Sequence, residues 1–111
     1  MWWPPCVSNK SHDPRAVIEI MVFRLKEGVD DNLFLEADET FRTSFLYRQK
    51  GLARATTARG SDGAWLLLTI WSRADAAETA AAAAQDDPIA QAFLDLVDRP
   101  TAQRRSYVEL D

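Results

Sequence analysis

The sequence predicts one α+β domain whose elements follow the order strand, helix, strand, strand, helix, strand. Three observations lead to this prediction. Residues 16–26 and 64–72 read as strands that are apolar on both faces, segments with helical periodicity follow each of them, and a turn at Ser61-Asp62-Gly63 joins the two middle strands as a hairpin. The chain has 111 residues, which suits a single domain because roughly 150 residues per domain is the usual guide.

The first predicted strand, residues 16–26, reads AVIEIMVFRLK and lies between Pro14 and Gly28. Successive side chains of a strand point to opposite faces. One face therefore carries Val17, Met21, Phe23 and Leu25, and the other carries Ile18, Ile20 and Val22. A strand that is apolar on both faces needs cover on both sides.

A helix and two strands are predicted next. An N-cap at Asp30 precedes a helix from Asp31 to Gln49, whose apolar residues recur every three or four positions, and Gly51 ends it. A second strand is predicted from Leu52 to Arg59, and the third, residues 64–72, reads AWLLLTIWS. One face of this third strand carries Trp65, Leu67, Thr69 and Trp71, and the other carries Ala64, Leu66, Leu68 and Ile70.

The second helical region is interrupted. Ser72 is the predicted N-cap of an alanine-rich helix, with Asp75 completing a capping-box-like pattern. Asp86-Asp87-Pro88 interrupts this helix, because Pro88 suits the first turn of a new one, which ends at Arg99-Pro100. A fourth strand is predicted from Gln103 to Leu110.

This order is that of the ferredoxin-like fold, with a four-stranded antiparallel sheet and the helices on one face. The other face is left without cover, and a monomer rarely leaves so large an apolar patch in water. The sequence therefore predicts an isologous homodimer in which two sheets pack face to face. The alternative is a monomer whose Trp2-Trp3 arm folds across this face. The residues of the face are Ile18, Ile20, Val22, Leu66, Leu68 and Ile70.

Residues 1–15 are predicted to be a flexible N-terminal arm in front of the domain at residues 16–111. The arm lacks the basic start and the apolar stretch of ~7–15 residues of a signal peptide, and no apolar run approaches the ~20 residues that cross a membrane. The single cysteine, Cys6, has no partner for an internal disulfide. A cytoplasmic protein with no membrane partner is predicted, and the net charge of −4 argues against a nucleic-acid partner.

Four segments of the chain resemble the dimeric α+β barrel superfamily, whose best-known members are the antibiotic-biosynthesis-type monooxygenases. They are VIEIMVFRLKEG, LLLTIWSRADA, DDPIAQAFLDLV and the closing strand with Tyr107, and the resemblance spans Val17 to Leu110. It implies a dimeric α+β barrel. Members include cofactor-free quinone-forming monooxygenases, haem-degrading enzymes, lactone isomerases and proteins without an assigned activity, because one fold hosts many chemistries.

The haem-degrading branch of this superfamily fits poorly. Its pattern implies an asparagine where the chain has Met21, a haem-ligating histidine where it has Phe93, and a tryptophan, which Trp71 matches. Haem chemistry has no anchor without an iron ligand, and the sole histidine, His12, lies in the arm. The sequence also has no Cys/His cluster or spaced carboxylate set, so neither a metal nor a cofactor is predicted.

One titratable residue of the predicted core is a candidate catalytic group. Glu19 shares the parity of Met21, which the resemblance places on the helix-facing side of the sheet. A carboxylate in such surroundings needs an ionic or hydrogen-bonding partner, and in an apolar pocket it suits a general base. The alternative is a structural ion pair with an arginine of the neighbouring last strand, for which Arg105 is the candidate.

Aromatic and polar residues around Glu19 predict an apolar pocket between the sheet and the helices. Such a box with one or two polar tips suits a small apolar or aromatic molecule, although the same residues suit an ordinary core. The alanine run Ala80 to Ala84 fills little volume, so it leaves space beneath its helix or lets the helix approach the sheet closely. The predicted pocket residues are Met21, Phe23, Trp65, Thr69, Trp71, Phe93 and Tyr107.

The favoured function is a homodimeric small-molecule-binding protein of the antibiotic-biosynthesis-monooxygenase-like type. As an enzyme it is a cofactor-free monooxygenase for an aromatic or polyketide-like substrate. In this hypothesis Glu19 deprotonates a phenol, while Trp71, Thr69 and Tyr107 position it. The alternatives are a non-catalytic ligand-binding module and a purely structural dimer.

Overall fold

The computed structural model describes residues 6–7 and 15–110 of the chain. The division at residue 15 into an arm and a domain stays a prediction, and Trp2, Trp3 and His12 lie outside the described residues. The elements are β1 (Cys6–Val7), β2 (Val17–Leu25), α1 (Asp31–Ser44), the 3-10 turn η1 (Leu46–Arg48), β3 (Leu52–Arg59), β4 (Trp65–Trp71), α2 (Ala74–Ala84), α3 (Pro88–Leu94) and β5 (Val97–Val108).

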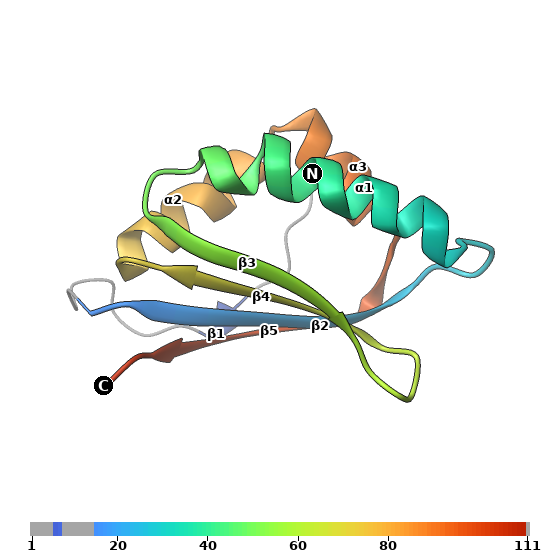
Figure 1. The fold of residues 1–111 in the computed structure, drawn as a ribbon, viewed down its shortest axis with the longest axis horizontal. Coiled ribbons are helices and arrows are strands. Elements are labelled where there is room, and N and C mark those ends of the chain that lie inside the picture. The colour runs from blue at the N-terminus through green and yellow to red at the C-terminus, as the bar shows by residue number, and fades with distance from the viewer. Residues whose placement is uncertain (1–5, 8–14, 111) are drawn as a thin grey trace.

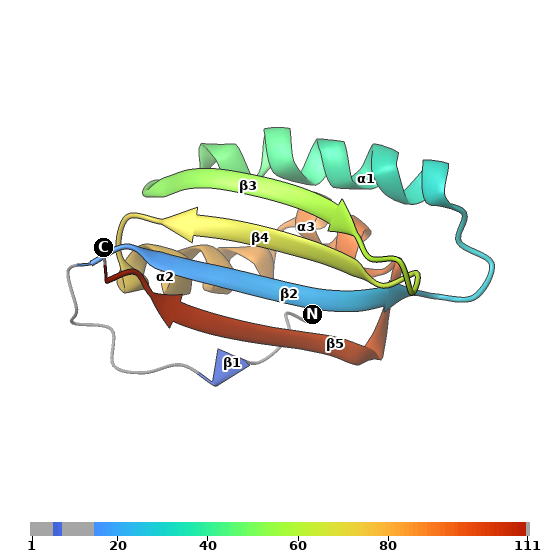
Figure 2. The ribbon, with the colours of Figure 1, turned by 60° about the horizontal axis from the view of Figure 1, so that its bottom comes forward.

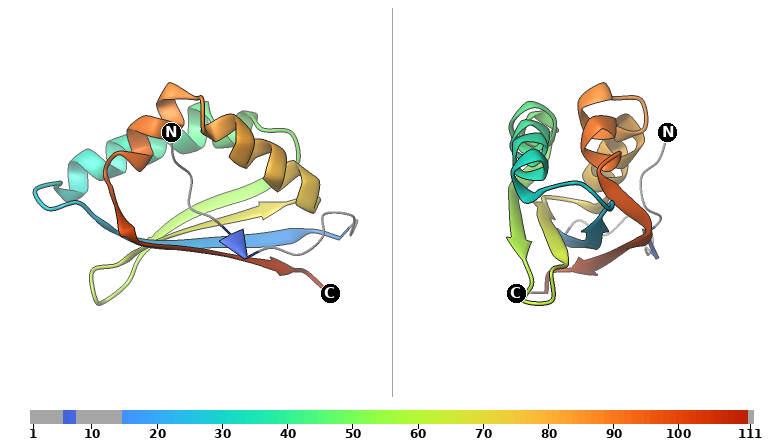
Figure 3. Two further views of the ribbon diagram at one scale, coloured as in Figure 1. Left: turned by 180° about the vertical axis from the view of Figure 1, so that it is seen from behind. Right: turned by 90° about the vertical axis from the view of Figure 1, so that its right-hand side faces the viewer.

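The domain has two layers, with the helices over one face of the sheet, where α2 and α3 follow one another alongside α1 (Figures 1 and 3). The strand order is β1-β5-β2-β4-β3, and the four long strands β5, β2, β4 and β3 are antiparallel to their neighbours. This confirms the predicted ferredoxin-like α+β fold. The view in Figure 2 looks onto the other face of the sheet, which no described helix covers.

The structure adds a short strand that the sequence did not predict. β1 pairs in parallel with β5, with Cys6 opposite Arg104 and Val7 opposite Arg105. Its two residues are too few to give an alternating pattern, which explains why the sequence did not reveal them.

The strand register confirms the predicted parity of β2 and β4. Met21 lies opposite Leu67 beneath the helices, and both are buried. Ile20 lies opposite Leu68 on the helix-free face, and neither side chain is fully buried there.

Two helices begin where the sequence predicts, with aspartate caps. The Asp30 carboxylate accepts a hydrogen bond from the backbone N–H of Leu33 at 2.8 Å, and Asp87 accepts bonds from Ile89 and Ala90 at 2.8 and 3.0 Å. Each cap satisfies helix N–H groups that have no partner within the helix.

Two predicted helix ends are wrong. The N-cap of α2 is Arg73 rather than Ser72, and no side chain caps this helix. The backbone N–H of Ser72 instead donates to the carbonyl oxygen of Gly51 at 2.7 Å, next to the pairing of Leu52 on β3 with Trp71 on β4. The first helix ends at Ser44 instead of Gln49, since Phe45 leaves the helical conformation with φ −123° and η1 follows.

The last strand begins earlier than predicted, so Arg99-Pro100 lies within β5 and does not separate it from α3. The register between β2 and β5 shifts between Val22 and Arg24, which face Gln103 and Asp98. This irregularity accommodates Pro100, whose nitrogen cannot donate to a strand partner.

The outer edges of β5 and β3 each have a hydrogen-bonding partner beyond the four long strands. β1 pairs with β5, and on the other side the Tyr47 hydroxyl bonds to β3. This hydroxyl accepts a hydrogen bond from the N–H of Ala55 and donates to the carbonyl oxygen of the same residue, both at 3.1 Å. At Ala55 it therefore satisfies both backbone groups that an edge strand leaves open.

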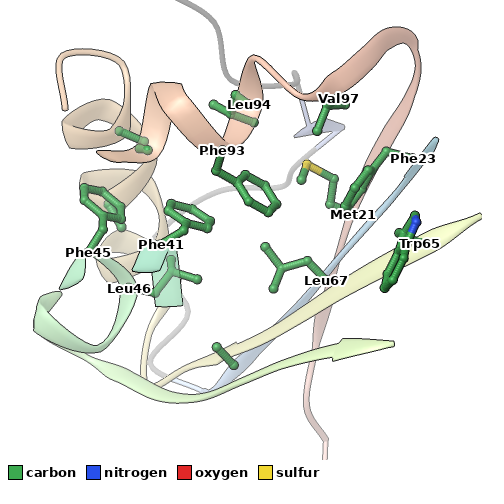
Figure 4. Close-up of a cluster of buried hydrophobic side chains, with 14 of the residues drawn as sticks. Met21, Phe23, Phe41, Phe45, Leu46, Trp65, Leu67, Phe93, Leu94 and Val97 are labelled. Atoms are coloured by element: carbon green, nitrogen blue, oxygen red, sulfur yellow. The ribbon is translucent and has the colours of Figure 1, made fainter. Parts of the chain in front are cut away.

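The core between sheet and helices is an aromatic cluster (Figure 4). The ring of Phe93 stacks on Phe41 at a centroid distance of 4.5 Å, and Phe34 lies 4.7 Å from Trp65.

A carboxylate is buried between α1 and β3. Asp38 on α1 accepts hydrogen bonds from the Thr57 hydroxyl at 2.7 Å and from Nε of Arg42 at 3.0 Å, which ties α1 to β3. None of the helices in the described part of the chain is long and apolar enough to cross a membrane.

Candidate functional site

Glu19 lies in the middle of β2 on the face beneath the helices and is only 7% exposed. Nη2 of Arg104 donates to both carboxylate oxygens, at 2.9 and 2.8 Å, and both side chains are 9% exposed. The expectation that Glu19 needs an ionic partner is therefore met by a buried ion pair. Such a pair satisfies the carboxylate and keeps a cation beside it.

The predicted partner, Arg105, is wrong. The residue opposite Glu19 on β5 is Ser106. Because every second residue of a strand points to the same face, Arg104 shares the face of Glu19 and Arg105 does not. Arg105 lies opposite Ile20 on the helix-free face and is exposed.

A second polar contact lies next to this ion pair. Thr69 on β4 is directly opposite Glu19, and its hydroxyl oxygen accepts a hydrogen bond from Nε1 of Trp71 at 2.9 Å. A hydroxyl that accepts one bond still has its own proton to donate. With Ser106 on β5, the residues Thr69 and Glu19 form a polar row across three strands of a floor that is otherwise mainly apolar.

A cavity of about 20 Å³ lies between this polar row and helix α2. That volume holds about one water molecule, which needs ~10–15 Å³. On the α2 side its wall is alanine, in line with the first of the two readings of the alanine run, and Phe45 and Leu46 line it as well. The lining residues are Glu19, Ile20, Met21, Phe45, Leu46, Leu67, Thr69, Trp71, Ala77, Ala80, Ala81 and Arg104.

No protein-family model and no curated protein matches the chain. Among solved structures, a variant of SnoaB, a cofactor-independent oxygenase from Streptomyces nogalater, superposes with a TM-score of 0.71 at 21% identity, over 87% of this chain and 95% of that one. A putative antibiotic biosynthesis monooxygenase from Bordetella bronchiseptica gives 0.71 at 14% identity over 87% and 99% of the two chains. One from Nitrosomonas europaea gives 0.67 at 14% identity over 94% and 96%.

The chain has the fold of the antibiotic biosynthesis monooxygenase-like proteins. The resemblance that the sequence indicated is thereby confirmed for the fold. Within this monooxygenase-like fold, the cavity beneath α2 is the place where buried polar groups meet an apolar space.

Four of the predicted site residues line the cavity, namely Glu19, Met21, Thr69 and Trp71. Three others do not line it. Phe23, Trp65 and Phe93 are buried in the aromatic cluster, where Phe23 meets Phe93 edge-on at 5.9 Å. Figure 4 shows Phe23 and Trp65 at the end of the cluster opposite Phe45 and Leu46.

Tyr107 is not part of this site. It lies opposite Ile18 on the helix-free face of the sheet and is 49% exposed. The prediction placed it on the wrong face because neither parity of the last strand is clearly apolar. Arg104 and Ser106 alternate with Gln103, Arg105 and Tyr107, so the sequence pattern does not indicate which set points inward.

The lining residues that sequence reasoning missed come from irregular or ambiguous positions. Phe45 and Leu46 follow the end of α1, where helical periodicity no longer applies. Arg104 is hidden in the tandem Arg104-Arg105. For Ala77 and Ala81 the alanine run was the available signal. Within residues 6–7 and 15–110, no three His, Cys, Asp or Glu side chains come together as a metal site.

Proposed function

We propose that the protein is a homodimer that binds a small aromatic or polyketide-like molecule and oxidises it as a cofactor-independent monooxygenase. One observation carries the proposal: the buried pair of Glu19 and Arg104, with Thr69 beside it, borders an apolar cavity between the sheet and α2. The likeness in fold to SnoaB, described as a cofactor-independent oxygenase, supports it.

The reaction that suits these residues needs no external reductant. The substrate is a phenol or enol conjugated to a ring methylene, and loss of one proton gives an electron-rich anion. Transfer of an electron to dioxygen and joining of the two radicals forms a C–O bond, and protonation gives a hydroperoxide. Loss of the second C–H proton then breaks the O–O bond. The CH2 group becomes C=O, one oxygen atom stays on the substrate, and the other leaves as water.

Each polar residue of the cavity has a role in this scheme. Glu19 accepts the substrate proton as general base. Arg104 then balances the charge of the substrate anion, because its own carboxylate partner has been neutralised. Thr69 donates its hydroxyl proton to a substrate oxygen, with its orientation fixed by the bond from Trp71.

The homodimer is proposed to form through the helix-free face of the sheet. Its apolar residues lie on β2 and β4 and remain partly exposed, with Val22 at 39%. A second copy buries the same patch by two-fold symmetry. In native mass spectrometry the wild type is expected to be a dimer and Leu68→Asp a monomer, whereas a wild-type monomer contradicts the proposed assembly. We also propose a cytoplasmic location.

Oxygen uptake tests the chemistry. A hydroxyanthrone carries the required phenol and ring methylene, so the purified protein is expected to raise its oxygen consumption above the protein-free rate and to form the quinone. Glu19→Gln should lower this rate by about 10²–10⁴-fold while the variant still binds the probe, because a general base contributes that much. Glu39→Gln, changed at an exposed position of α1, is the matched control. Equal rates in the two variants contradict the role of Glu19.

A non-catalytic ligand-binding or structural dimer is the second candidate. The cavity volume of about 20 Å³ favours it, because pockets for drug-sized ligands are ~300–1,000 Å³. The same probe separates the candidates: binding without oxygen uptake indicates a ligand-binding module, and neither binding nor uptake indicates a structural dimer.

A further inference from the structure

The helix-free face of the sheet has an apolar centre between two margins. β2 and β4 form the centre, and β5 and β3 are the margins (Figure 2). The strand register arranges the side chains of this face in three rows, each with an aliphatic pair from β2 and β4 between one residue of β5 and one of β3. In row order, the residues on the β5 and β3 margins are Tyr107 and Arg54, Arg105 and Thr56, and Gln103 and Ala58.

The charge in these three rows is positive and lies on the margins. Arg105 is in the middle row on β5, Arg54 is in an end row on β3, and both are exposed. Nε of Arg54 donates to the Thr56 hydroxyl at 3.0 Å, which keeps this arginine along the β3 margin. Tyr107, at the other end of the row of Arg54, is 49% exposed. The margins are therefore unlike, and a second copy can meet them in favourable or unfavourable pairs.

The direction of the two-fold axis decides which residues meet when two such sheets face each other. An axis perpendicular to the strands keeps β5 over the partner's β5 and brings Arg105 opposite the partner's Arg105. A diagonal axis makes the sheets orthogonal and moves Arg105 over the aliphatic pair of an end row. The first arrangement opposes like charges, and the second buries a charge against aliphatic side chains, so both are unfavourable.

An axis parallel to the strands avoids both penalties. It preserves the rows and exchanges the margins, so that β5 of one copy lies over β3 of the other. Arg105 then faces the partner's Thr56, whose hydroxyl accepts hydrogen bonds, and Tyr107 faces the partner's Arg54. Facing sheets are about 10 Å apart, a gap that two long side chains bridge.

We infer that Tyr107 and Arg54 set the orientation of the homodimer: its two-fold axis runs along the strands, and each Tyr107 ring packs against the partner's Arg54. The inference rests on the homodimer of the proposed function and adds its orientation and its contacts between copies. A guanidinium is attracted to the face of a tyrosine ring, and two-fold symmetry makes this contact twice. Tyr107, which does not line the cavity, thereby has a role in assembly.

Mixing two single variants tests this contact directly. Tyr107→Lys opposes two cations at both contacts of its own homodimer and should raise the dimer dissociation constant by about 100-fold or more. In a heterodimer with Arg54→Glu, the new lysine faces the new glutamate, and the unchanged Tyr107 faces the unchanged Arg54. Native mass spectrometry of an equimolar mixture of the full-length variants should therefore show heterodimers well above the statistical half.

A matched control separates this pairing from a change in net charge. Arg48→Glu makes the same substitution at an exposed position of η1. Mixed with Tyr107→Lys, it should give no more than the statistical share of heterodimers. Thermal unfolding verifies that each variant is folded.

The double variant Tyr107→Lys/Arg54→Glu provides a second measurement. It should recover the dimer affinity that Tyr107→Lys loses, as followed by sedimentation equilibrium at about 0.15 M salt. Within one chain these positions are three strand spacings apart, about 14 Å, which exceeds the screening length of about 8 Å at this salt. Recovery therefore reports a contact between copies.

The outcomes distinguish the orientation from the dimer itself. If Leu68→Asp dissociates the dimer while Tyr107→Lys has no effect, the proposed interface stands and the inferred orientation is wrong. Heterodimers at the statistical share, or a double variant that stays dissociated, also overturn the orientation. A wild-type monomer, as in the alternative of an N-terminal arm across this face, overturns both the assembly and the inference.

Discussion

The layer between sheet and helices differs between its two ends. Beneath α1 and α3 the rings of Phe34, Phe41 and Phe93 are fully buried, and Phe93 contacts the other two. On α2 the buried side chains are alanines, and beneath them lies a cavity lined by a buried ion pair as well as by Phe45 and Trp71. One end is thus filled by packed rings, while the other holds buried polar groups beside a small cavity.

The largest expected effect tests the aromatic end. Phe93→Ala removes a fully buried ring that contacts Phe23, Phe34 and Phe41. It should lower the free energy of unfolding by about 3–5 kcal/mol, through lost burial and the void left behind. Chemical denaturation measures this change. A loss under about 1 kcal/mol contradicts the assignment of stability to this end.

The polar end should be sensitive to the loss of one charge. Arg104→Met leaves the Glu19 carboxylate buried without its cation and should cost about 3 kcal/mol of unfolding free energy. Adding Glu19→Gln to this variant removes the uncompensated charge and should recover part of the loss. Arg48→Met, at an exposed position of η1, should change stability by under about 0.5 kcal/mol. Denaturation curves that give the two arginine variants equal stability contradict the pairing.

The same enlargement at two buried alanines compares the ends directly. Ala90→Val on α3 adds volume next to filled space and should cost about 1–3 kcal/mol, as overpacking does. Ala80→Val on α2 adds the same volume beside the cavity and should cost clearly less. The difference between their denaturation midpoints is the measurement, and a reversed order shows that the cavity cannot accept a side chain.

The smallest expected effect concerns the helix caps. Asp87→Ala removes the carboxylate that caps α3 and should cost about 1 kcal/mol. Ser72→Ala should change the unfolding free energy less, because the structure shows no side-chain cap on α2. Thermal unfolding of the two variants compares them. A larger loss of stability for Ser72→Ala than for Asp87→Ala would show that the Ser72 side chain caps α2.

Most of the fold could be predicted from the sequence because its strongest signals are local and redundant. The alternation in residues 16–26 and 64–72, the Asp62-Gly63 turn and the aspartate caps all agree with one architecture. The pairing of β1 with β5 and the early start of β5 were not predictable, since a two-residue strand and a strand containing Pro100 lack that pattern.

The candidate site was predictable only in part. Glu19, Met21, Thr69 and Trp71 were found because their parity is fixed by clearly patterned strands. The predicted partner of Glu19, Arg105, is one residue past the observed partner, Arg104. The pattern of the last strand does not show which of its two sets of alternate residues faces the helices, and a one-residue shift moves every side chain to the opposite face. Tyr107 was misplaced for the same reason.

The Tyr47 hydroxyl bound to both backbone groups of Ala55 has a consequence for assembly. An uncovered strand can recruit another strand, and each addition exposes a new edge, so such growth has no natural end. Because Tyr47 bonds to β3 and β1 pairs with β5, the outer edges of β3 and β5 have no open backbone groups at these positions for another strand to pair with. In the proposed homodimer a second copy binds to the face of the sheet instead, where two-fold pairing uses up the contact surface and stops at two chains.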